Sequence, residues 1–326
     1  MSDILRPWMR IVSSAISAGH THNLDQSQSR DFFKLLLEGE GTDAQLATIF
    51  SVLRSKGTAP EELAGAAIAA RERITFPELP SNAIVVASTR LGKRKSPSLG
   101  LASASIAAGC GIPVLLQASP GLRDGASPGD LWNHMCGDLT GDPKVVESMF
   151  GKGNLACWSP TFGDSGWERL QRIEDETLLR GIPDIVTKLL LPEGVAVLSA
   201  AIPGPVLAIA ANALECLGHR NAIVVQGVES SFDPFVTNTT YGLRITEGRK
   251  SPLRLNPFDC GLFEENEPSL ESVKDFLESE QIIKQVLLGI PSPALSSALL
   301  GAGLIISLAN PNESISTCVK EAEESV

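Results

Sequence analysis

The sequence has few aromatic residues and no closely spaced cysteines. Only 5% of its 326 residues are Phe, Trp or Tyr, with a single tyrosine, so a stacking platform for single-stranded nucleic acid would have few side chains to draw on. The cysteines contain no Cys-x-x-Cys pair, unlike those of a disulfide-rich scaffold or a structural zinc site. We therefore expect reduced thiols at Cys110, Cys136, Cys157, Cys216, Cys260 and Cys318.

Signatures of several large enzyme classes are also missing. The sequence has no P-loop and no Gly-x-Gly-x-x-Gly fingerprint, and no predicted strand leads into a nucleophile elbow, which removes the usual support for an NTPase, a dinucleotide-binding enzyme or a serine hydrolase. The N-terminal segment is interrupted by Asp3, Arg6 and Arg10, so it is not a secretory signal, and we expect a cytoplasmic protein.

One segment, 285–312, carries no charge and is long enough to span a bilayer. Because Pro291 and Pro293 interrupt it, a buried core helix is the better interpretation, and we expect no membrane association.

Acidic side chains outnumber basic ones. The sequence holds 38 Asp and Glu against 27 Lys and Arg, a net charge of −11. This excess disfavours general coating of nucleic acid unless basic residues gather on one face. With 43% hydrophobic residues, the chain is a globular protein, and its length favours one large domain with a smaller partner.

The first 76 residues are predicted to form a small helical domain of four helices. Asp25 precedes one helix, Thr42 with Gln45 forms a capping box before the next, and Thr58 with Glu61 forms a third start signal around Pro60. One apolar stripe at helical spacing is made of Leu46, Ile49, Phe50 and Leu53.

Residues 81–326 are predicted to form a large α/β domain with a mainly parallel sheet, and a helix near 164–180 is expected to return to the small domain. Short apolar runs alternate with helical stretches, as in β-α-β units. The clearest strands are 83–88, 112–116, 154–159, 195–200 and 222–227. Ligands of such sheets bind beyond the carboxyl ends of the strands.

The loop after the first of these strands is the leading candidate for an anion site. It combines hydroxyls, a glycine and four cations before a helix that begins near Ser98, an arrangement that suits phosphate or carboxylate. A solvated run of charge is the alternative. The candidate residues are Ser88, Thr89, Arg90, Gly92, Lys93, Arg94, Lys95 and Ser96. Replacing Lys93, Arg94 and Lys95 together by alanine is expected to weaken phosphate binding and barely alter thermal stability.

A second candidate follows the strand 222–227. Glu229 and Asp233 could hold Mg²⁺ through carboxylate oxygens and water, although Asp233 before Pro234 also suits a polar turn. The segment His20-Thr21-His22 has no ligand partner nearby and is interpreted as a loop between helices.

Several stretches resemble the anthranilate phosphoribosyltransferase family, also called glycosyltransferase family 3. The resemblance covers nearly the whole chain and is carried by residues 41–74, 104–114, 217–234 and 256–262. It implies a class II phosphoribosyltransferase fold, substrate in the cleft between the two domains, and a homodimer built through the helical domains, where we expect Trp8, Ile11 and Phe50 to contribute.

Three family motifs differ here. The family's Gly-Thr-Gly-Gly-Asp-Gly loop, which cradles pyrophosphate, corresponds to residues 88–97 without those glycines. Its acceptor-facing Lys-His-Gly-Asn-Arg corresponds to 116–120, where Gln117 is retained as a binding candidate. Its Asp-Glu metal pair corresponds to Asp233-Pro234, so a Mg²⁺ site would need Glu229.

This pattern is similar to the divergent second branch of the family, which includes nucleic-acid-binding proteins. Such binding would use the loop cations together with Arg244, Arg249, Lys250 and Arg254. The leading hypothesis is therefore a phosphoribosyltransferase-like protein that binds a phosphorylated ribose or nucleotide and transfers the phosphoribosyl group with release of pyrophosphate. The alternatives are a non-catalytic dimer that binds nucleic acid and a scaffold that has kept only the fold.

The differences at 116–120 predict that anthranilate is a poor acceptor. Each lost donor costs on the order of 2–4 kcal/mol of transition-state stabilisation, so several losses lower turnover by many decades. Steady-state assays with anthranilate and phosphoribosyl diphosphate check this, and turnover at an ordinary enzyme rate would contradict it.

Overall fold

The computed structural model describes residues 3–17, 23–88, 90, 92–119, 121, 126–271 and 276–326. The chain divides into two compact units. The first comprises Met1–Thr75, Pro160–Leu190 and Asn212–Leu217, and the second comprises Phe76–Ser159, Leu191–Ala211 and Gly218–Val326. His20-Thr21-His22 lie outside the described residues.

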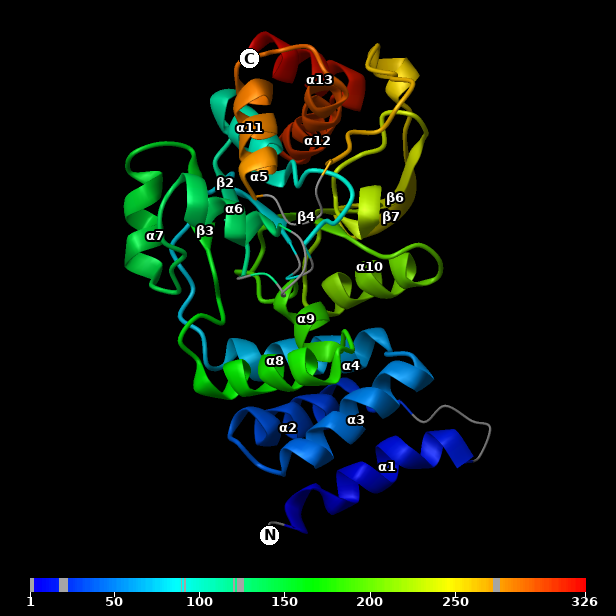
Figure 1. Cartoon of the computed structure of the whole chain (residues 1–326). Helices are drawn as coiled ribbons and strands as arrows, with labels where there is room; N and C mark the ends of the chain where they lie inside the picture. The colour runs from blue at the N-terminus through cyan, green and yellow to red at the C-terminus, as the bar shows by residue number, and fades with distance from the viewer. Residues whose placement is uncertain are drawn as a thin grey trace. The chain divides into compact units, whose positions relative to one another are not determined.

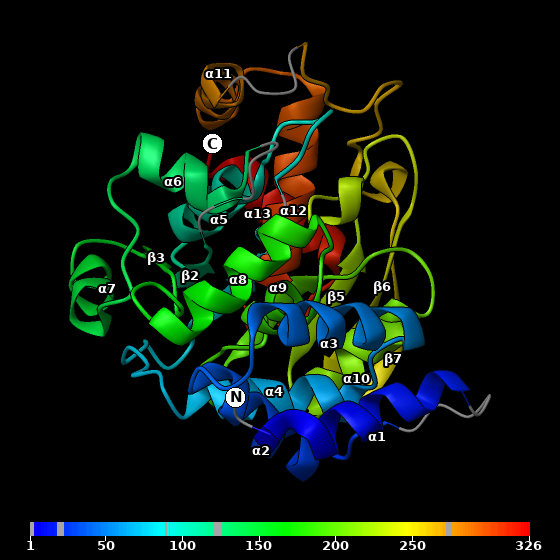
Figure 2. The same cartoon turned by 60° about the horizontal axis from the view of Figure 1, so that its bottom comes forward.

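The first unit is a helical bundle. After a short 3-10 turn, η1, helix α4 packs along α2, while α3 packs against α1 and α8 (Figures 1 and 2). The short helix α9 contacts α4 and α8. The bounds are η1 Asp3–Leu5, α1 Arg6–Ser17, α2 Gln26–Leu37, α3 Asp43–Lys56, α4 Pro60–Arg71, α8 Ser165–Thr177 and α9 Ile182–Thr187.

Two of the three predicted helix starts are confirmed. Asp25 accepts the backbone N–H of Gln28 at 2.8 Å, and Thr42 and Gln45 form the expected reciprocal capping box. The third prediction is wrong by one residue, because α4 begins at Pro60 and Glu62, not Glu61, accepts the N–H of Ala59 at 2.9 Å.

The apolar stripe of α3 is used inside this unit. Leu46, Ile49, Phe50 and Leu53 are all buried, and Phe50 is only 5% exposed. Trp8 stacks on Phe32 with ring centroids 5.4 Å apart. The expectation that Phe50 belongs to a dimer surface is therefore wrong, because its side chain already lies in the core of its own chain.

The second unit is built on a sheet of seven described strands in the order β3-β2-β1-β4-β5-β6-β7. The first five pair in parallel, whereas β5, β6 and β7 pair antiparallel. All five predicted strands are confirmed, and the β6–β7 hairpin was not expected. The bounds are β1 Ile84–Ala87, β2 Val114–Gln117, β3 Leu155–Trp158, β4 Ala196–Ala200, β5 Ala222–Gln226, β6 Thr240–Thr246 and β7 Arg249–Leu255.

Helices α5 (Gly100–Gly109) and α12 (Pro293–Ala309) pack together and against the sheet, and α13 (Ile315–Glu324) packs on α12. Most of α12 is buried, which confirms a core helix in the uncharged segment. No helix within the described ranges is long and apolar enough to cross a membrane. The remaining elements are α6 Pro128–Met135, α7 Pro143–Phe150, α10 Val206–Cys216, η2 Val228–Ser230, η3 Pro257–Cys260 and α11 Phe276–Leu287.

Close packing of α2 on α4 depends on Gly65. A Cβ at this position would overlap the backbone oxygen of Gln26 and lie 2.8 Å from the backbone nitrogen of Arg30. Gly65→Ala is expected to destabilise the protein by about 1–3 kcal/mol through overpacking. Chemical denaturation checks this, with Gly153→Ala as the control, since a Cβ at Gly153 meets nothing within 4 Å. Equal stability of the two variants would contradict the expectation.

Candidate functional site

The predicted anion loop lies at the carboxyl end of β1 and is fixed by bonds to distant segments. Ser88 donates its hydroxyl to the carbonyl of Gln117 at 2.8 Å, at the end of the neighbouring β2. Further along, the backbone N–H of Lys93 donates to Ala126, and the carbonyl of Lys95 accepts from Leu270 at 2.8 Å. Ser88, Lys93 and Lys95 are therefore tied to distant segments, unlike residues of a solvated charge run.

The cations of this loop fall into two groups. Arg90 and Lys93 are buried, 6% and 5% exposed, whereas Arg94 and Lys95 are exposed. Lys93 forms a buried ion pair with Asp233, with 2.5 Å between Nζ and Oδ2. The expectation that replacing Lys93, Arg94 and Lys95 together would barely alter thermal stability is therefore wrong, because Lys93 is paired in the interior. Thr89 lies outside the described residues, and Gly92 is half-buried.

The backbone donors of the loop converge on the carboxylate of Glu229. Its Oε2 accepts the N–H of Arg94 at 2.9 Å. Its Oε1 accepts the N–H of Lys95 at 3.0 Å and that of Ser96 at 2.8 Å, together with the Ser96 hydroxyl at 2.6 Å. We call these four donors the amide cradle. Successive backbone N–H groups of this kind form anion-binding concavities.

The position of Glu229 requires an unfavourable backbone conformation. Glu229 and Ser230 both adopt left-handed conformations, with φ of 49° and 64°, which cost of order 1–3 kcal/mol each for residues other than glycine. Burial raises the pKa of Glu229, but the bonds from Ser96 and from the backbone of Arg94 and Lys95 outweigh it, so the pKa lies below its usual value. The side chain is therefore a carboxylate at neutral pH.

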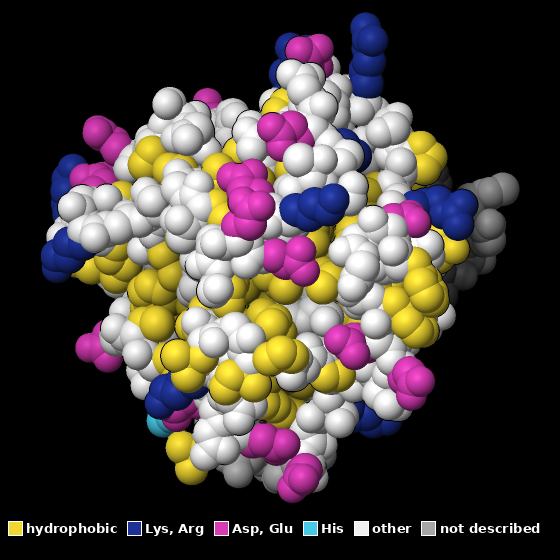
Figure 3. All heavy atoms as spheres, turned by 90° about the horizontal axis from the view of Figure 1, so that it is seen from above, with side chains coloured by type: hydrophobic (Ala, Val, Ile, Leu, Met, Phe, Trp, Pro, Cys, Tyr) yellow, Lys and Arg dark blue, Asp and Glu magenta, His cyan; other side chains and the backbone are white. Residues whose placement is uncertain are grey.

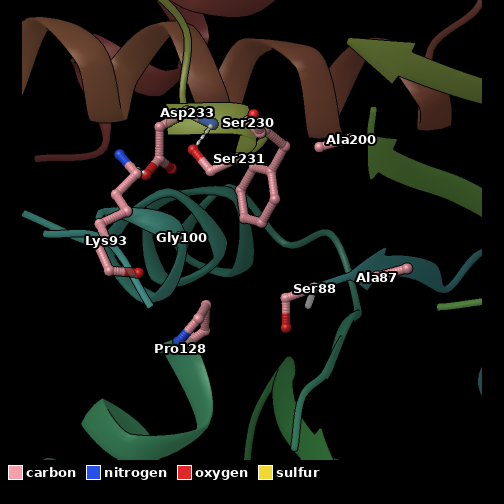
Figure 4. A pocket seen from close by; sticks show the side chains of 11 residues that line it. Ala87, Ser88, Lys93, Gly100, Pro128, Ala200, Ser230, Ser231 and Asp233 are labelled. Atoms are coloured by element: carbon pink, nitrogen blue, oxygen red, sulfur yellow. Dashed lines mark hydrogen bonds and ion pairs between the residues drawn. The ribbon is translucent and has the colours of Figure 1, made fainter. Parts of the chain in front are cut away.

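The first turn of α5 is closed by protein groups. Asp233 accepts the N–H of Leu99 at 3.1 Å, and a Cβ at Gly100 would lie 2.5 Å from the ring of Phe232. Only a small cavity of about 20 Å³ remains beside Lys93 and Asp233 (Figure 4), enough for one water molecule. The expectation that the N-terminus of α5 reinforces the anion site is wrong, because Asp233 and Phe232 already cover it.

The donor set here does not fit Mg²⁺. Both oxygens of Glu229 accept hydrogen bonds, and Oδ2 of Asp233 faces the Lys93 ammonium. Within the described ranges, no group of three or more His, Cys, Asp or Glu side chains could hold a metal. A magnesium ion prefers several unhindered oxygen ligands in octahedral geometry.

The other candidate residues belong to other strands of the sheet or to the residues that follow them. Leu116 and Gln117 are buried at the end of β2, and Pro120 lies outside the described residues. Arg244 on β6 is half-buried and donates to the Ser307 carbonyl at 3.3 Å. On the neighbouring β7, Arg249, Lys250 and Arg254 are exposed.

Sequence reasoning placed the loop correctly but missed what fills and closes it. Phe232 was not singled out, although it lies between the two acidic candidates, Glu229 and Asp233. Gly100, the position that admits its ring, was not singled out either. An aromatic residue paired with a glycine at a helix start carries no distinctive sequence signal.

Comparisons with known proteins give a consistent picture. A profile described as "Glycosyl transferase family, helical bundle domain" matches residues 15–74. The chain is 26% identical over 307 residues to an anthranilate phosphoribosyltransferase of Syntrophobacter fumaroxidans, covering 93% of this chain and 90% of that one. It is 25% identical over 280 residues to anthranilate phosphoribosyltransferase 2 of Ralstonia nicotianae, covering 84% and 80%.

Solved structures have the same fold. The crystal structure of anthranilate phosphoribosyltransferase from Thermus thermophilus superposes with a TM-score of 0.79 at 22% identity, covering 97% of this chain and 94% of that one. The Saccharomyces cerevisiae enzyme in complex with PRPP and Mg gives 0.79 at 16% identity, covering 97% and 92%.

Lys93 and Lys95 should differ sharply when each is replaced by alanine. Lys93→Ala leaves the buried carboxylate of Asp233 without its cation, which costs about 3–5 kcal/mol. Lys95→Ala removes an exposed side chain and should change stability by less than about 0.5 kcal/mol. Thermal melting of the two variants checks this, and a Lys93→Ala protein as stable as Lys95→Ala would contradict the burial of the ion pair.

Proposed function

We propose, from the premise that this chain belongs to the anthranilate phosphoribosyltransferase family, that it binds a phosphorylated ribose or nucleotide at the amide cradle. The observation that carries the proposal is the convergence of three consecutive backbone N–H groups and the Ser96 hydroxyl on one carboxylate. A phosphate group presents the same kind of acceptor oxygens with more charge, so it can replace that carboxylate.

Glu229 makes this replacement geometrically simple. The residue is exposed although its carboxylate is held by the loop, so the side chain can swing out into solvent. Leaving the cradle also frees Glu229 and Ser230 to relax from their left-handed conformations. The exposed Arg94 and Lys95 flank the vacated donors and would face a ligand phosphate.

The reaction that suits such a site is displacement of pyrophosphate at the anomeric carbon of a phosphoribosyl donor. This chemistry needs positioning of the donor and neutralisation of the leaving group, with little demand for a nucleophilic side chain. The cradle N–H groups would donate hydrogen bonds to the pyrophosphate and stabilise the negative charge that develops on it. Support comes from the S. cerevisiae relative, which was solved with PRPP and Mg.

Glu229→Gln provides the test. The neutral amide competes less well for the cradle, so phosphoribosyl diphosphate should bind more tightly, by about tenfold or more, since hydrogen bonds to charged groups contribute ≈ 1.5–3 kcal/mol. Calorimetry measures the affinity. Glu267→Gln is the matched control, because Glu267 also accepts backbone N–H groups, those of Val236 and Thr237, but lies in another loop.

Unchanged affinity in Glu229→Gln would contradict displacement of the carboxylate. Ser96→Ala should act in the opposite direction and weaken binding, because it removes a donor of the cradle itself. Absence of any binding to the parent protein would refute the proposed function.

Nucleic acid is a second candidate ligand, favoured by one feature of the β6–β7 hairpin. Arg254 lies 5.6 Å from the centroid of the exposed Tyr241 ring, and such a pair can stack on bases. The exposed Arg249 and Lys250 lie at the other end of the same strand. On the face in Figure 3, however, basic side chains are interspersed with acidic ones. This candidate requires affinity that falls steeply with salt.

We also propose the homodimer of the family for this chain.

A further inference from the structure

We propose that Lys93 is a built-in cation that takes the place of a divalent metal, so that phosphate ligands bind this protein without Mg²⁺. The inference rests on the proposed function and deepens it, because it states what neutralises the ligand. The S. cerevisiae relative was solved with PRPP and Mg, whereas the oxygens of Glu229 and Asp233 in this chain do not fit a magnesium ion.

The ammonium of Lys93 occupies the place where a metal bound by Oδ2 of Asp233 would lie. Its Nζ is 2.5 Å from Oδ2 of Asp233, and both side chains are almost fully buried. A divalent cation on the same oxygen would stand against a positive charge in a desolvated site, where repulsion is weakly screened. Oδ2 of Asp233 therefore cannot serve both cations.

The remaining oxygens nearby are also used. Glu229 gives both of its carboxylate oxygens to the amide cradle. Pro234 has no side-chain oxygen, and its carbonyl accepts the hydroxyl of Ser297 at 2.9 Å. Of the side-chain oxygens of these residues, Oδ1 of Asp233 is the one that is buried without a hydrogen-bond partner in the described part of the chain, and one carboxylate oxygen is too few ligands for a magnesium site.

Lys93 has the capacity to act on a ligand directly. An ammonium carries three N–H donors, and the described acceptors are Oδ2 of Asp233 and the Pro97 carbonyl at 3.1 Å. Its side chain lines the small cavity together with Ser88, and Figure 4 shows it reaching toward Asp233 there. A phosphate that enters the loop beside this cavity meets a fixed positive charge that needs no metal.

The test compares ligand binding with and without magnesium. Calorimetry with ribose 5-phosphate, and separately with phosphoribosyl diphosphate, is run in EDTA and in excess MgCl₂. Affinity for ribose 5-phosphate should agree within about twofold between the two conditions, because no ion is bound together with the ligand. Binding that appears only with MgCl₂ would overturn the inference while leaving the proposed function intact. Failure of both ligands to bind in both conditions would instead refute the proposed function.

A second measurement tests the metal site without any ligand. Thermal melting of the parent protein is compared in MgCl₂ and in NaCl of equal ionic strength. The two melting temperatures should coincide, and a rise specific to MgCl₂ would overturn the inference even if no phosphate ligand binds. Lys93→Met, which keeps most of the aliphatic stem, should weaken ribose 5-phosphate binding by about tenfold or more in either buffer. Lys152→Met is the control, because Lys152 is exposed and lies before the amino end of β3.

Restoration of Lys93→Met binding by MgCl₂ would show that a metal can use the site, and would contradict the claim that the donor set excludes it. If Lys93→Met does not fold, the two measurements on the parent protein decide the question alone.

Discussion

The carboxylate of Glu229 is the group on which the geometry of the candidate site depends. It ties the loop after β1 to the loop after β5 through residues more than 130 positions apart in the chain. The backbone N–H groups of Arg94, Lys95 and Ser96 point to one place because this acceptor lies there. Without such an acceptor, four convergent donors would be left to water or to another anion.

The second acidic residue, Asp233, fixes the inner side of the same loop. It holds Lys93 in the interior and takes the N–H of Leu99 at the start of α5. The two carboxylates therefore have different partners: Asp233 pairs with a buried ammonium, and Glu229 accepts the N–H groups of the amide cradle. This difference explains why a loop rich in cations does not present them all to solvent, and it is one reason why we propose an anion site in an acidic protein.

Much of the fold could be predicted from the sequence because its signals are local. The runs that became β1 to β5 are apolar and flanked by turns, and Asp25 and Thr42 cap helices through partners three residues away. The β6–β7 hairpin was not predicted because β7 is a mostly polar strand that contains Pro252. The helix start predicted from Thr58 was wrong because α4 begins at Pro60, so that Ala59 is the residue that precedes the first turn.

The position of the candidate site could be predicted from the sequence, but the contacts between its residues could not. The loop after β1 was recognised from its cations and its place in the sheet. The burial of Lys93 depends on Asp233, and the occupation of the amide cradle depends on Glu229, both of which are remote in sequence. Periodicity and motif spacing report neighbours along the chain, so they cannot reveal such pairs.

A crystal structure of the protein grown with phosphoribosyl diphosphate tests the central claim most directly. The account predicts phosphate oxygens within hydrogen-bond distance of the N–H groups of Arg94, Lys95 and Ser96, Glu229 displaced into solvent, and the Lys93–Asp233 pair intact. A ligand bound elsewhere, with Glu229 still seated on the amide cradle, would contradict it.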